Sequence, residues 1–287
     1  MEGLSTWSQA ALGAVAARST GGPVGRDLRI TINFHPDRET AGRTILGALA
    51  HDGRLRSQFE TGTSNGGLTA YPGGDRWRWE SRIFDGAYDD APTSARPVYG
   101  ALDVDHRPLG AAPRFGSAVV RLHKDVLDRA TFCFPDSALD PDTFGTAERF
   151  SRLAAARAAA GPGADPLDGY IEAQVHGGVR LPDDVEALVL DPCFRGTPVE
   201  HAARALGVPV EWHDGRVLSV ESLREHADYR DPPALAAGEA LAADGPIDAL
   251  AIGRAVRAGE FDARALKQLW HLTAQWGEAR EPGRGSR

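Results

Sequence analysis

Apolar and polar residues alternate with a period of two in two stretches of the chain. In residues 28–35, leucine, isoleucine and phenylalanine alternate with arginine, threonine, asparagine and histidine. In residues 170–176, isoleucine, alanine and valine alternate with tyrosine, glutamate, glutamine and histidine. Because successive side chains of a strand point to opposite faces of a sheet, both stretches predict half-buried strands. The polar face of the second strand, with Glu172 at its centre, suits either the wall of a cleft or the outside of an edge strand.

Helical spacing is found between such strands and dominates the end of the chain. An alanine-rich run within residues 1–20 and the stretch 39–50 each predict a helix. Residues 234–276 favour helix almost throughout, in two segments that Asp244-Gly245-Pro246 separates. Two short strands around Asp214-Gly215 predict a hairpin. The pattern therefore predicts an α+β protein of many short strands with an N-terminal helix and a helical C-terminal appendage.

Composition and charge narrow the class of protein. The 287 residues include 42% hydrophobic and 25% charged residues, which is typical of a soluble globular protein. The net charge of -8 argues against a general nucleic-acid binder. We expect no membrane partner, because no apolar run approaches the ~20 residues of a membrane span. No Sec signal is visible, which predicts a cytoplasmic protein or one delivered into a host or competitor cell by another route.

The cysteines and histidines predict no metal site. Cys133 and Cys193 form no C-x-x-C pair, and no H-E-x-x-H sequence is present. We expect both cysteines to be reduced and buried in strands. Metal cofactors are therefore not expected.

A loop rich in glycine and hydroxyl side chains follows a predicted short strand that begins at Arg54. Its residues Gly62, Thr63, Ser64 and Asn65 can bring backbone N–H groups close to a ligand, because glycine lacks a Cβ atom. The same residues with Gly66 also fit G-x-S-x-G, the nucleophile motif of α/β-hydrolases. That motif needs a helix directly after the serine, and the residues that follow favour no helix. A serine hydrolase with His176 or His35 as the base is thus an alternative.

The stretch after this loop mixes aromatic side chains with arginines. Trp77, Trp79, Phe84 and Tyr88 alternate there with several guanidinium groups. The pattern fits a cap over a site, and it fits a packed core equally well.

Four polar features are placed on successive predicted strands: Arg56, the loop 62–65, Ser117 and Glu172. In this order they resemble the ADP-ribosyltransferases of the arginine–serine–glutamate type, a clan that includes many bacterial toxins. Four segments are similar to a bacterial and fungal family whose studied members include an effector that ADP-ribosylates ubiquitin on threonine. These segments are residues 58–67, 77–80, 99–102 and 170–177.

The resemblance covers about residues 28–220 and implies NAD as co-substrate. It implies that Glu172 is the catalytic carboxylate, that Arg56 contacts the dinucleotide phosphates and that Ser117 braces the site. It also implies strongly twisted sheets of short strands. Further NAD-binding candidates are His35, Phe59, Gly62, Thr63, Ser64 and Asn65.

One departure from the clan bears on the acceptor. Members that modify arginine usually carry an acidic residue two positions before the catalytic glutamate, where this chain has Tyr170. We therefore expect a threonine or serine hydroxyl as acceptor, with ubiquitin as the candidate protein, or water, which would make the protein an NAD glycohydrolase. A register with Gln174 as the catalytic residue is rejected, because an amide lacks the negative charge that the reaction needs.

The sequence as a whole predicts three regions. Residues 1–27 form an N-terminal helical segment, residues 28–231 form the catalytic domain, and residues 232–287 form the helical appendage with a mobile tail. We expect the appendage to serve as an accessory or target-recognition element.

Overall fold

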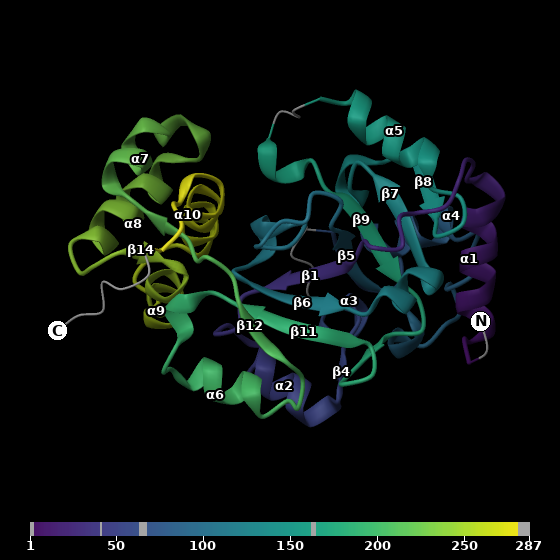
Figure 1. The fold of residues 1–287 in the computed structure, drawn as a ribbon, viewed down its shortest axis with the longest axis horizontal. Coiled ribbons are helices and arrows are strands. Elements are labelled where there is room, and N and C mark those ends of the chain that lie inside the picture. Colours follow the sequence, from purple (N-terminus) through teal and green to yellow (C-terminus); the bar gives the residue numbers. More distant parts are fainter. Residues whose placement is uncertain (1–2, 41, 63–67, 162–164, 281–287) are drawn as a thin grey trace. The chain divides into compact units, whose positions relative to one another are not determined.

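The computed structural model describes residues 3–40, 42–62, 68–161 and 165–280 (Figure 1). The two alternating stretches form strands β1 (Ile30–Phe34) and β9 (Ile171–Val175) of one mixed, open sheet. The strand order of this sheet is β12-β11-β6-β1-β5-β9-β7-β8. Its other strands are β5 (Val98–Leu102), β6 (Ala118–Leu122), β7 (Ala130–Phe134), β8 (Thr143–Thr146), β11 (Val185–Leu190) and β12 (Val210–Trp212). The predicted α+β class is confirmed.

Strand β9 is a central strand with antiparallel neighbours on both sides. Glu172 lies opposite Ala101 of β5 and Cys133 of β7. All five residues of β9 are buried, so the prediction of a half-buried strand is wrong. The alternation is real, but the polar face is buried as well, with Glu172 only 7% exposed.

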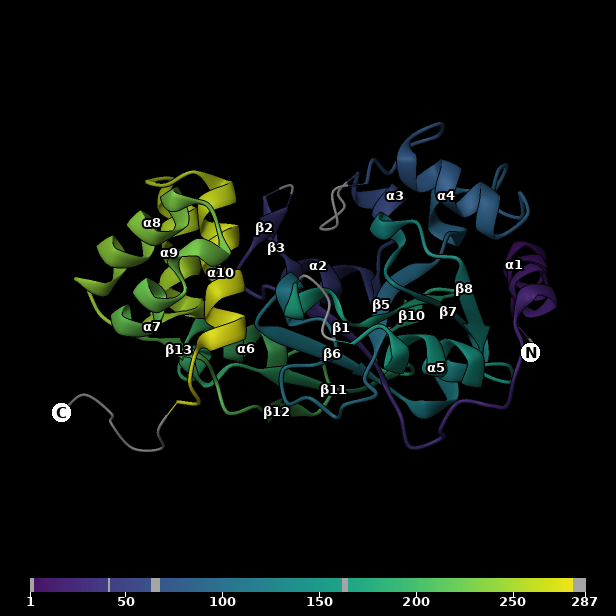
Figure 2. The same cartoon turned by 90° about the horizontal axis from the view of Figure 1, so that it is seen from above.

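Helices cover both faces of this part of the sheet (Figures 1 and 2). Helix α5 (Ser151–Ala159) packs on the face of Phe132, whose ring meets that of Phe150 edge to face at 5.4 Å. Helices α1 (Thr6–Arg18) and α4 (Asp75–Ile83) cover the other face, which carries Cys133 and Glu172. Residues 75–83 of the aromatic stretch thus form a helix, and Trp79 belongs to the core.

The segment after Arg54 differs from the predicted strand and loop. Strand β4 contains only Arg54–Leu55 and pairs with β10 (Val179–Arg180). Helix α3 (Gln58–Thr61) follows, because the Ser57 and Glu60 side chains form a capping box at its start. Gly62 ends the helix with a φ of 63°, a conformation that glycine adopts without strain. Thr63, Ser64 and Asn65 lie outside the described residues.

The chain forms two compact units, each made of separate stretches. The first comprises residues 1–32, 52–112 and 120–186, and the second comprises residues 33–51, 113–119 and 187–287. The domain boundaries expected at residues 27 and 231 stay predictions. Within the described residues, no helix has the length and apolar character needed to cross a membrane.

Helices make up most of the second unit (Figure 1). The predicted helix from residue 247 to 276 is divided, because Gly259 adopts a φ of 69° and Asp262 caps a new helix. The remaining helices are α2 (Ile45–Asp52), α6 (Pro198–Arg204), α7 (Val220–Glu225), α8 (Pro232–Ala242), α9 (Ala249–Ala258) and α10 (Ala263–Trp276). The remaining short strands are β2 (Glu39–Thr40), β3 (Arg43–Thr44), β13 (Val217–Leu218) and β14 (Ile247–Asp248).

The predicted hairpin around Asp214-Gly215 is wrong. Strand β12 pairs in parallel with β11, and β13 pairs with β14 instead of β12. The turn residues are held from elsewhere in the second unit. His213 Nε2 lies 2.8 Å from the Ser117 carbonyl oxygen, and the Arg216 N–H donates to the Asp191 carboxylate. These bonds direct the two short strands to different partners.

A buried carboxylate cluster as the candidate active site

The Glu172 carboxylate in the first unit is held by three side chains from three elements. Ser137, at the start of a short 3₁₀ turn after β7, donates its hydroxyl to Oε2 at 2.7 Å. Gln174 of β9 donates its amide to Oε1 at 2.9 Å. The guanidinium of Arg76 on α4 lies 3.9 Å from Oε1. The carboxylate is 9% exposed, so a small edge of it remains open.

Arg76 connects Glu172 to a second buried carboxylate. Its guanidinium donates to the Ser137 hydroxyl at 2.6 Å and lies over the Tyr99 ring, 4.2 Å from the ring centre. The Tyr99 hydroxyl donates to Glu80 at 2.8 Å, and Arg96 pairs with the other oxygen of Glu80 at 2.6 Å. Two buried carboxylates and two buried guanidiniums therefore balance each other.

Burial sets the electrostatics of the cluster. It raises the pKa of Glu172 above the ordinary value, and the positive charge of Arg76 and the hydrogen bond from Ser137 oppose this shift. Burial likewise raises the pKa of the Cys133 thiol, and the nearby Glu172 charge adds to the effect. The thiol is thus held in its neutral, unreactive form. Glu172 remains the candidate for chemistry at this site.

A chain of hydrogen bonds fixes the amide of Gln174. Thr131 donates its hydroxyl to Gln174 Oε1 at 2.8 Å. The Thr131 hydroxyl has one proton, and the bond to Gln174 uses it. His176 Nε2 lies 3.0 Å from the Thr131 oxygen and must therefore be the donor in this contact. His176 Nδ1 then accepts from the Tyr88 hydroxyl at 2.7 Å. Burial lowers the pKa of His176 to about 3, which keeps the imidazole neutral.

The residues predicted around the loop have other partners. Arg56 is ion-paired with Asp52 at 2.6 Å and its side chain is 42% exposed. Phe59 is buried, and the Arg96 guanidinium lies 4.1 Å from the centre of its ring. Within the described residues, neither side chain forms a hydrogen bond or an ion pair with Glu172. The guanidinium beside Glu172 is that of Arg76.

Ser117 and His35 belong to the second unit. Ser117 is buried directly before β6, and its hydroxyl makes no hydrogen bond within the described part of the chain. His35 follows β1, and its ring meets that of Trp270 edge to face at 5.3 Å. Burial, together with the positive charges of Arg38 and Lys267 and the nearby His271, lowers the pKa of His35 to about 3. Its imidazole is therefore neutral.

Sequence reasoning missed Arg76 and Ser137. A signal for Arg76 was present, because Arg76, Trp79, Glu80 and Ile83 have the spacing of one helical face and are all buried. Two charged residues on such a face indicate a buried polar site. For Ser137 no comparable signal exists, since its position follows from the turn after β7.

The described residues offer no group of three or more histidine, cysteine or acidic side chains that could hold a metal ion. Cys133 and Cys193 are both free thiols. The prediction that Cys133 is buried in a strand is confirmed, whereas Cys193 is partly buried in a 3₁₀ turn.

Comparison with known proteins assigns the chain to a family. The "Gene 2 protein" of Mycobacterium phage L5 is 29% identical to this chain over 176 residues. That match covers 51% of this chain and 62% of the phage protein, less than two thirds of its length. The model of the family described as "Protein of unknown function (DUF3626)" matches residues 29–161 and 154–278. Because these residues make up most of the sequence, the chain belongs to the DUF3626 family.

Proposed function

We propose that this protein is an NAD-dependent mono-ADP-ribosyltransferase with Glu172 as its catalytic carboxylate. It transfers ADP-ribose from NAD to a serine or threonine hydroxyl of an acceptor protein, with ubiquitin as the candidate acceptor, and releases nicotinamide. The observation that carries the proposal is the Glu172 carboxylate, held on a central strand by Ser137, Gln174 and Arg76. The fold would be that of the arginine–serine–glutamate clan.

The chemistry explains why such a carboxylate is useful. Cleavage of the bond between nicotinamide and ribose passes through an oxocarbenium-like state, as glycoside hydrolysis does. An ionised carboxylate beside the ribose stabilises the developing positive charge, most strongly where water is excluded. Arg76 favours the ionised form of Glu172 against the effect of burial. The donors on both carboxylate oxygens keep the group in one orientation before the substrate binds.

The surroundings of Tyr170 support a hydroxyl acceptor. Its phenol is buried and donates a hydrogen bond to the Asp136 carboxylate. The position where arginine-modifying enzymes usually carry an acidic residue is thus filled by a ring that packs inside the unit. Water in place of the protein hydroxyl would give an NAD glycohydrolase with the same catalytic residue.

The test compares the wild-type protein with Glu172→Gln, which keeps the side-chain volume and removes the charge. Purified protein is incubated with labelled NAD and with ubiquitin, and both nicotinamide release and label on ubiquitin are measured. We expect Glu172→Gln to lower nicotinamide release by about 100-fold or more. Glu186→Gln, a carboxylate paired with Arg29 and Arg121, is the matched control and retains activity.

The two readouts separate the candidate reactions. Label on ubiquitin supports the transferase, and nicotinamide release without label on ubiquitin or on lysate proteins supports the glycohydrolase. Full activity of Glu172→Gln would show that another residue performs the chemistry. Absence of NAD cleavage by the wild-type protein under all acceptor conditions would contradict the proposed function itself.

The serine hydrolase has less support. His176 is fully buried, and both of its ring nitrogens are engaged by Tyr88 and Thr131. A general base needs a ring nitrogen that can take the proton of the nucleophile, and both nitrogens of this imidazole are used in these two contacts. Loss of ester hydrolysis in Ser64→Ala, without any need for NAD, would be the result that favours this alternative.

A further inference from the structure

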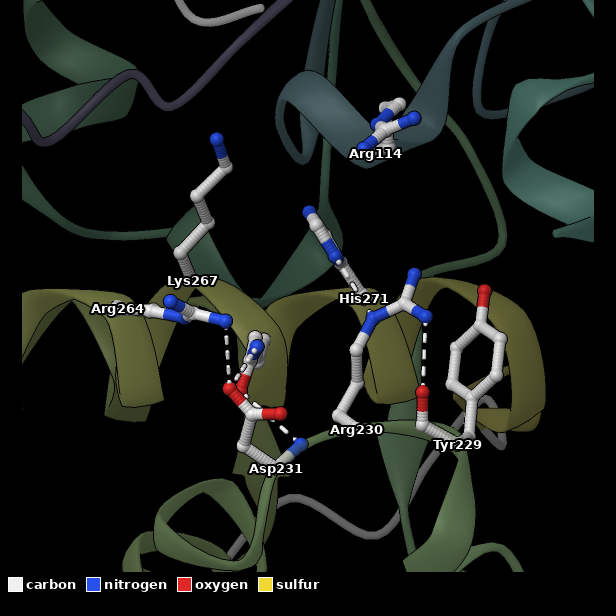
Figure 3. A pocket seen from close by; sticks show the side chains of 8 residues that line it. Arg114, Tyr229, Arg230, Asp231, Arg264, Lys267 and His271 are labelled. Atoms are coloured by element: carbon white, nitrogen blue, oxygen red, sulfur yellow. Dashed lines mark hydrogen bonds and ion pairs between the residues drawn. The ribbon is translucent and has the colours of Figure 1, made fainter. Parts of the chain in front are cut away.

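A pocket of about 450 Å³ in the second unit has four cationic side chains among its eight lining residues. Figure 3 shows them: Arg264 and Lys267 from α10, Arg114 from the 3₁₀ turn Pro113–Phe115, and Arg230 from the chain before α8. The one carboxylate in the lining is Asp231. The lining therefore holds four cationic side chains and one carboxylate, in a chain whose net charge is -8.

The cations converge because helical spacing and a tertiary contact place them together. Arg264, Lys267 and His271 lie at positions i, i+3 and i+7 of α10 and therefore on one face of the helix. Trp270 on the same helix donates its indole N–H to the Pro113 carbonyl at 2.8 Å, which holds the turn carrying Arg114 against α10. The arrangement is part of the packed fold of this unit.

Figure 3 shows the Lys267 ammonium and the His271 imidazole directed away from α10, toward the side on which Arg114 lies. Arg230 donates through Nε to His271 Nδ1 at 3.1 Å. The proton of the imidazole must then be on Nε2, because Nδ1 accepts in this contact. The Asp231 carboxylate lies at the other side of the pocket, where Arg264 at 2.8 Å and Gln268 at 3.0 Å bind it.

The cationic side chains around the pocket make it harder for Lys267 to carry its positive charge. The pKa of Lys267 is lowered first by burial and then by the guanidiniums of Arg114 and Arg38. Like charges gathered in a partly buried hollow strengthen its attraction for an anion. A diphosphate carries more negative charge than a single carboxylate and offers more acceptor oxygens to a group of guanidinium and ammonium donors.

We propose that this pocket binds the diphosphate group of a small molecule through Arg114, Arg230 and Lys267. Guanidinium groups bind phosphate oxygens in pairs of parallel hydrogen bonds, and the lysine ammonium adds a compact charge. The volume is that of a small-molecule site, which favours a nucleotide or free pyrophosphate as ligand. The proposal does not depend on NAD cleavage at Glu172.

The chain offers a direct probe, since Lys124 and Lys267 are its only lysines. Reductive methylation with ¹³C-formaldehyde labels both and keeps their charge. In the full-length protein, pyrophosphate is expected to shift the Lys267 resonance in a saturable way and to raise the pKa of Lys267. Lys124 is exposed, so its resonance reports any general effect of added salt.

Calorimetry with two variants tests the charges. We expect Lys267→Gln to weaken pyrophosphate binding by about tenfold or more. The matched control is Arg254→Gln, which removes an exposed charge of α9 outside the pocket lining and should leave the affinity unchanged. Thermal unfolding of both variants checks that the fold persists.

The ligands used in the titrations distinguish the source of the diphosphate. Displacement of pyrophosphate by both ADP and NAD supports a dinucleotide, and displacement by ADP alone supports another nucleotide. Three results would each overturn the proposal: no shift of Lys267 with any diphosphate, equal binding of succinate and pyrophosphate, or unchanged affinity in Lys267→Gln. Glu172→Gln should bind pyrophosphate like the wild type, so a failure here is separate from a failure of the proposed transferase.

Discussion

Gln174 donates its side-chain amide to Glu172 Oε1 at 2.9 Å, from the same face of the same strand. Residues two apart on a strand share a face, and here one orients the other. The donor is fixed, because the Gln174 carbonyl oxygen accepts from Thr131 and cannot exchange places with the nitrogen without losing both bonds. Gln174 therefore positions Glu172.

Thr131→Val tests this positioning. The change keeps the side-chain shape but removes the hydroxyl that donates to Gln174 and accepts from His176. We expect the free energy of unfolding to fall by about 1–3 kcal/mol, because buried polar groups lose partners. NAD cleavage should lose about tenfold in kcat with little change in KM, since a freely turning amide can present its oxygen to Glu172.

The control for that variant is Thr146→Val. Thr146 lies directly opposite Thr131 in the β7–β8 pair and is also buried, but it has no described bond to the Gln174 network. Denaturant unfolding and steady-state NAD cleavage are measured for both variants. Equal losses of kcat in the two would mean that only the stability of the sheet matters.

Arg76→Gln tests the electrostatic support of Glu172. Removing the guanidinium takes away a charge that lowers the pKa of Glu172, so this pKa should rise further. Because the proposed reaction needs the ionised carboxylate, the acidic limb of the pH profile of kcat/KM for NAD cleavage should move to higher pH. Arg78→Gln, on the same helix with a side chain that is 68% exposed, should leave the limb in place. An unchanged limb in Arg76→Gln would exclude this role.

The strand with Glu172 could be predicted from the sequence because the pattern that specifies a strand lies within the strand itself. Alternation over residues 170–176 defines a strand whatever surrounds it. What covers its polar face is not local, since that face meets α1 and α4, about 90 or more residues earlier in the chain. The prediction of a hairpin around Asp214-Gly215 was wrong because it too depends on contacts with distant residues. Its turn residues bind Ser117 and Asp191, which no pattern near residue 214 reveals.

The order of residues along the predicted strands did not identify the cation that lies beside Glu172. Arg56 was chosen for its place in the chain, but the strand there ends at Leu55, and Arg56 pairs with Asp52 at the surface. Arg76 is buried and reaches Glu172 from a helix. Its helical spacing with Trp79 and Glu80 was the available local signal. The role of Arg56 toward NAD phosphates remains a prediction.

The pair of Glu80 and Arg96 gives a prediction for stability. Both side chains are at most 3% exposed, and Tyr99 also donates to Glu80. Arg96→Gln leaves the buried Glu80 carboxylate without the cation that opposes the effect of burial on its pKa, which should lower the free energy of unfolding by about 3–5 kcal/mol. Glu239→Gln breaks the exposed pair with Arg224 and should cost at most about 1 kcal/mol. Chemical denaturation at neutral pH measures both, and similar small losses would show that the buried pair contributes no more than the exposed one.

Glu172 and Glu186 should affect stability with opposite signs. Burial raises the pKa of Glu172 above 4.5 in the folded protein, so its favourable contribution is present below that pH and is lost as the pH rises through the folded pKa. Burial would also raise the pKa of Glu186, but Arg29 and Arg121 outweigh it and lower that pKa below 4.5. Its contribution is present above pH 4.5 and is lost as the pH falls through the folded pKa.

Glu172→Gln should therefore unfold at a higher temperature than the wild type at pH 7, because Gln resembles the protonated carboxyl that the fold prefers. The difference should shrink toward pH 4, where the wild-type Glu172 takes up its proton. Glu186→Gln should unfold at a lower temperature at pH 7, and this difference should also shrink in acid. Calorimetric scans of the three proteins from pH 4 to pH 8 measure both trends. A Glu172→Gln protein that is less stable than the wild type at pH 7 would mean that Arg76 stabilises the ionised carboxylate by more than burial costs.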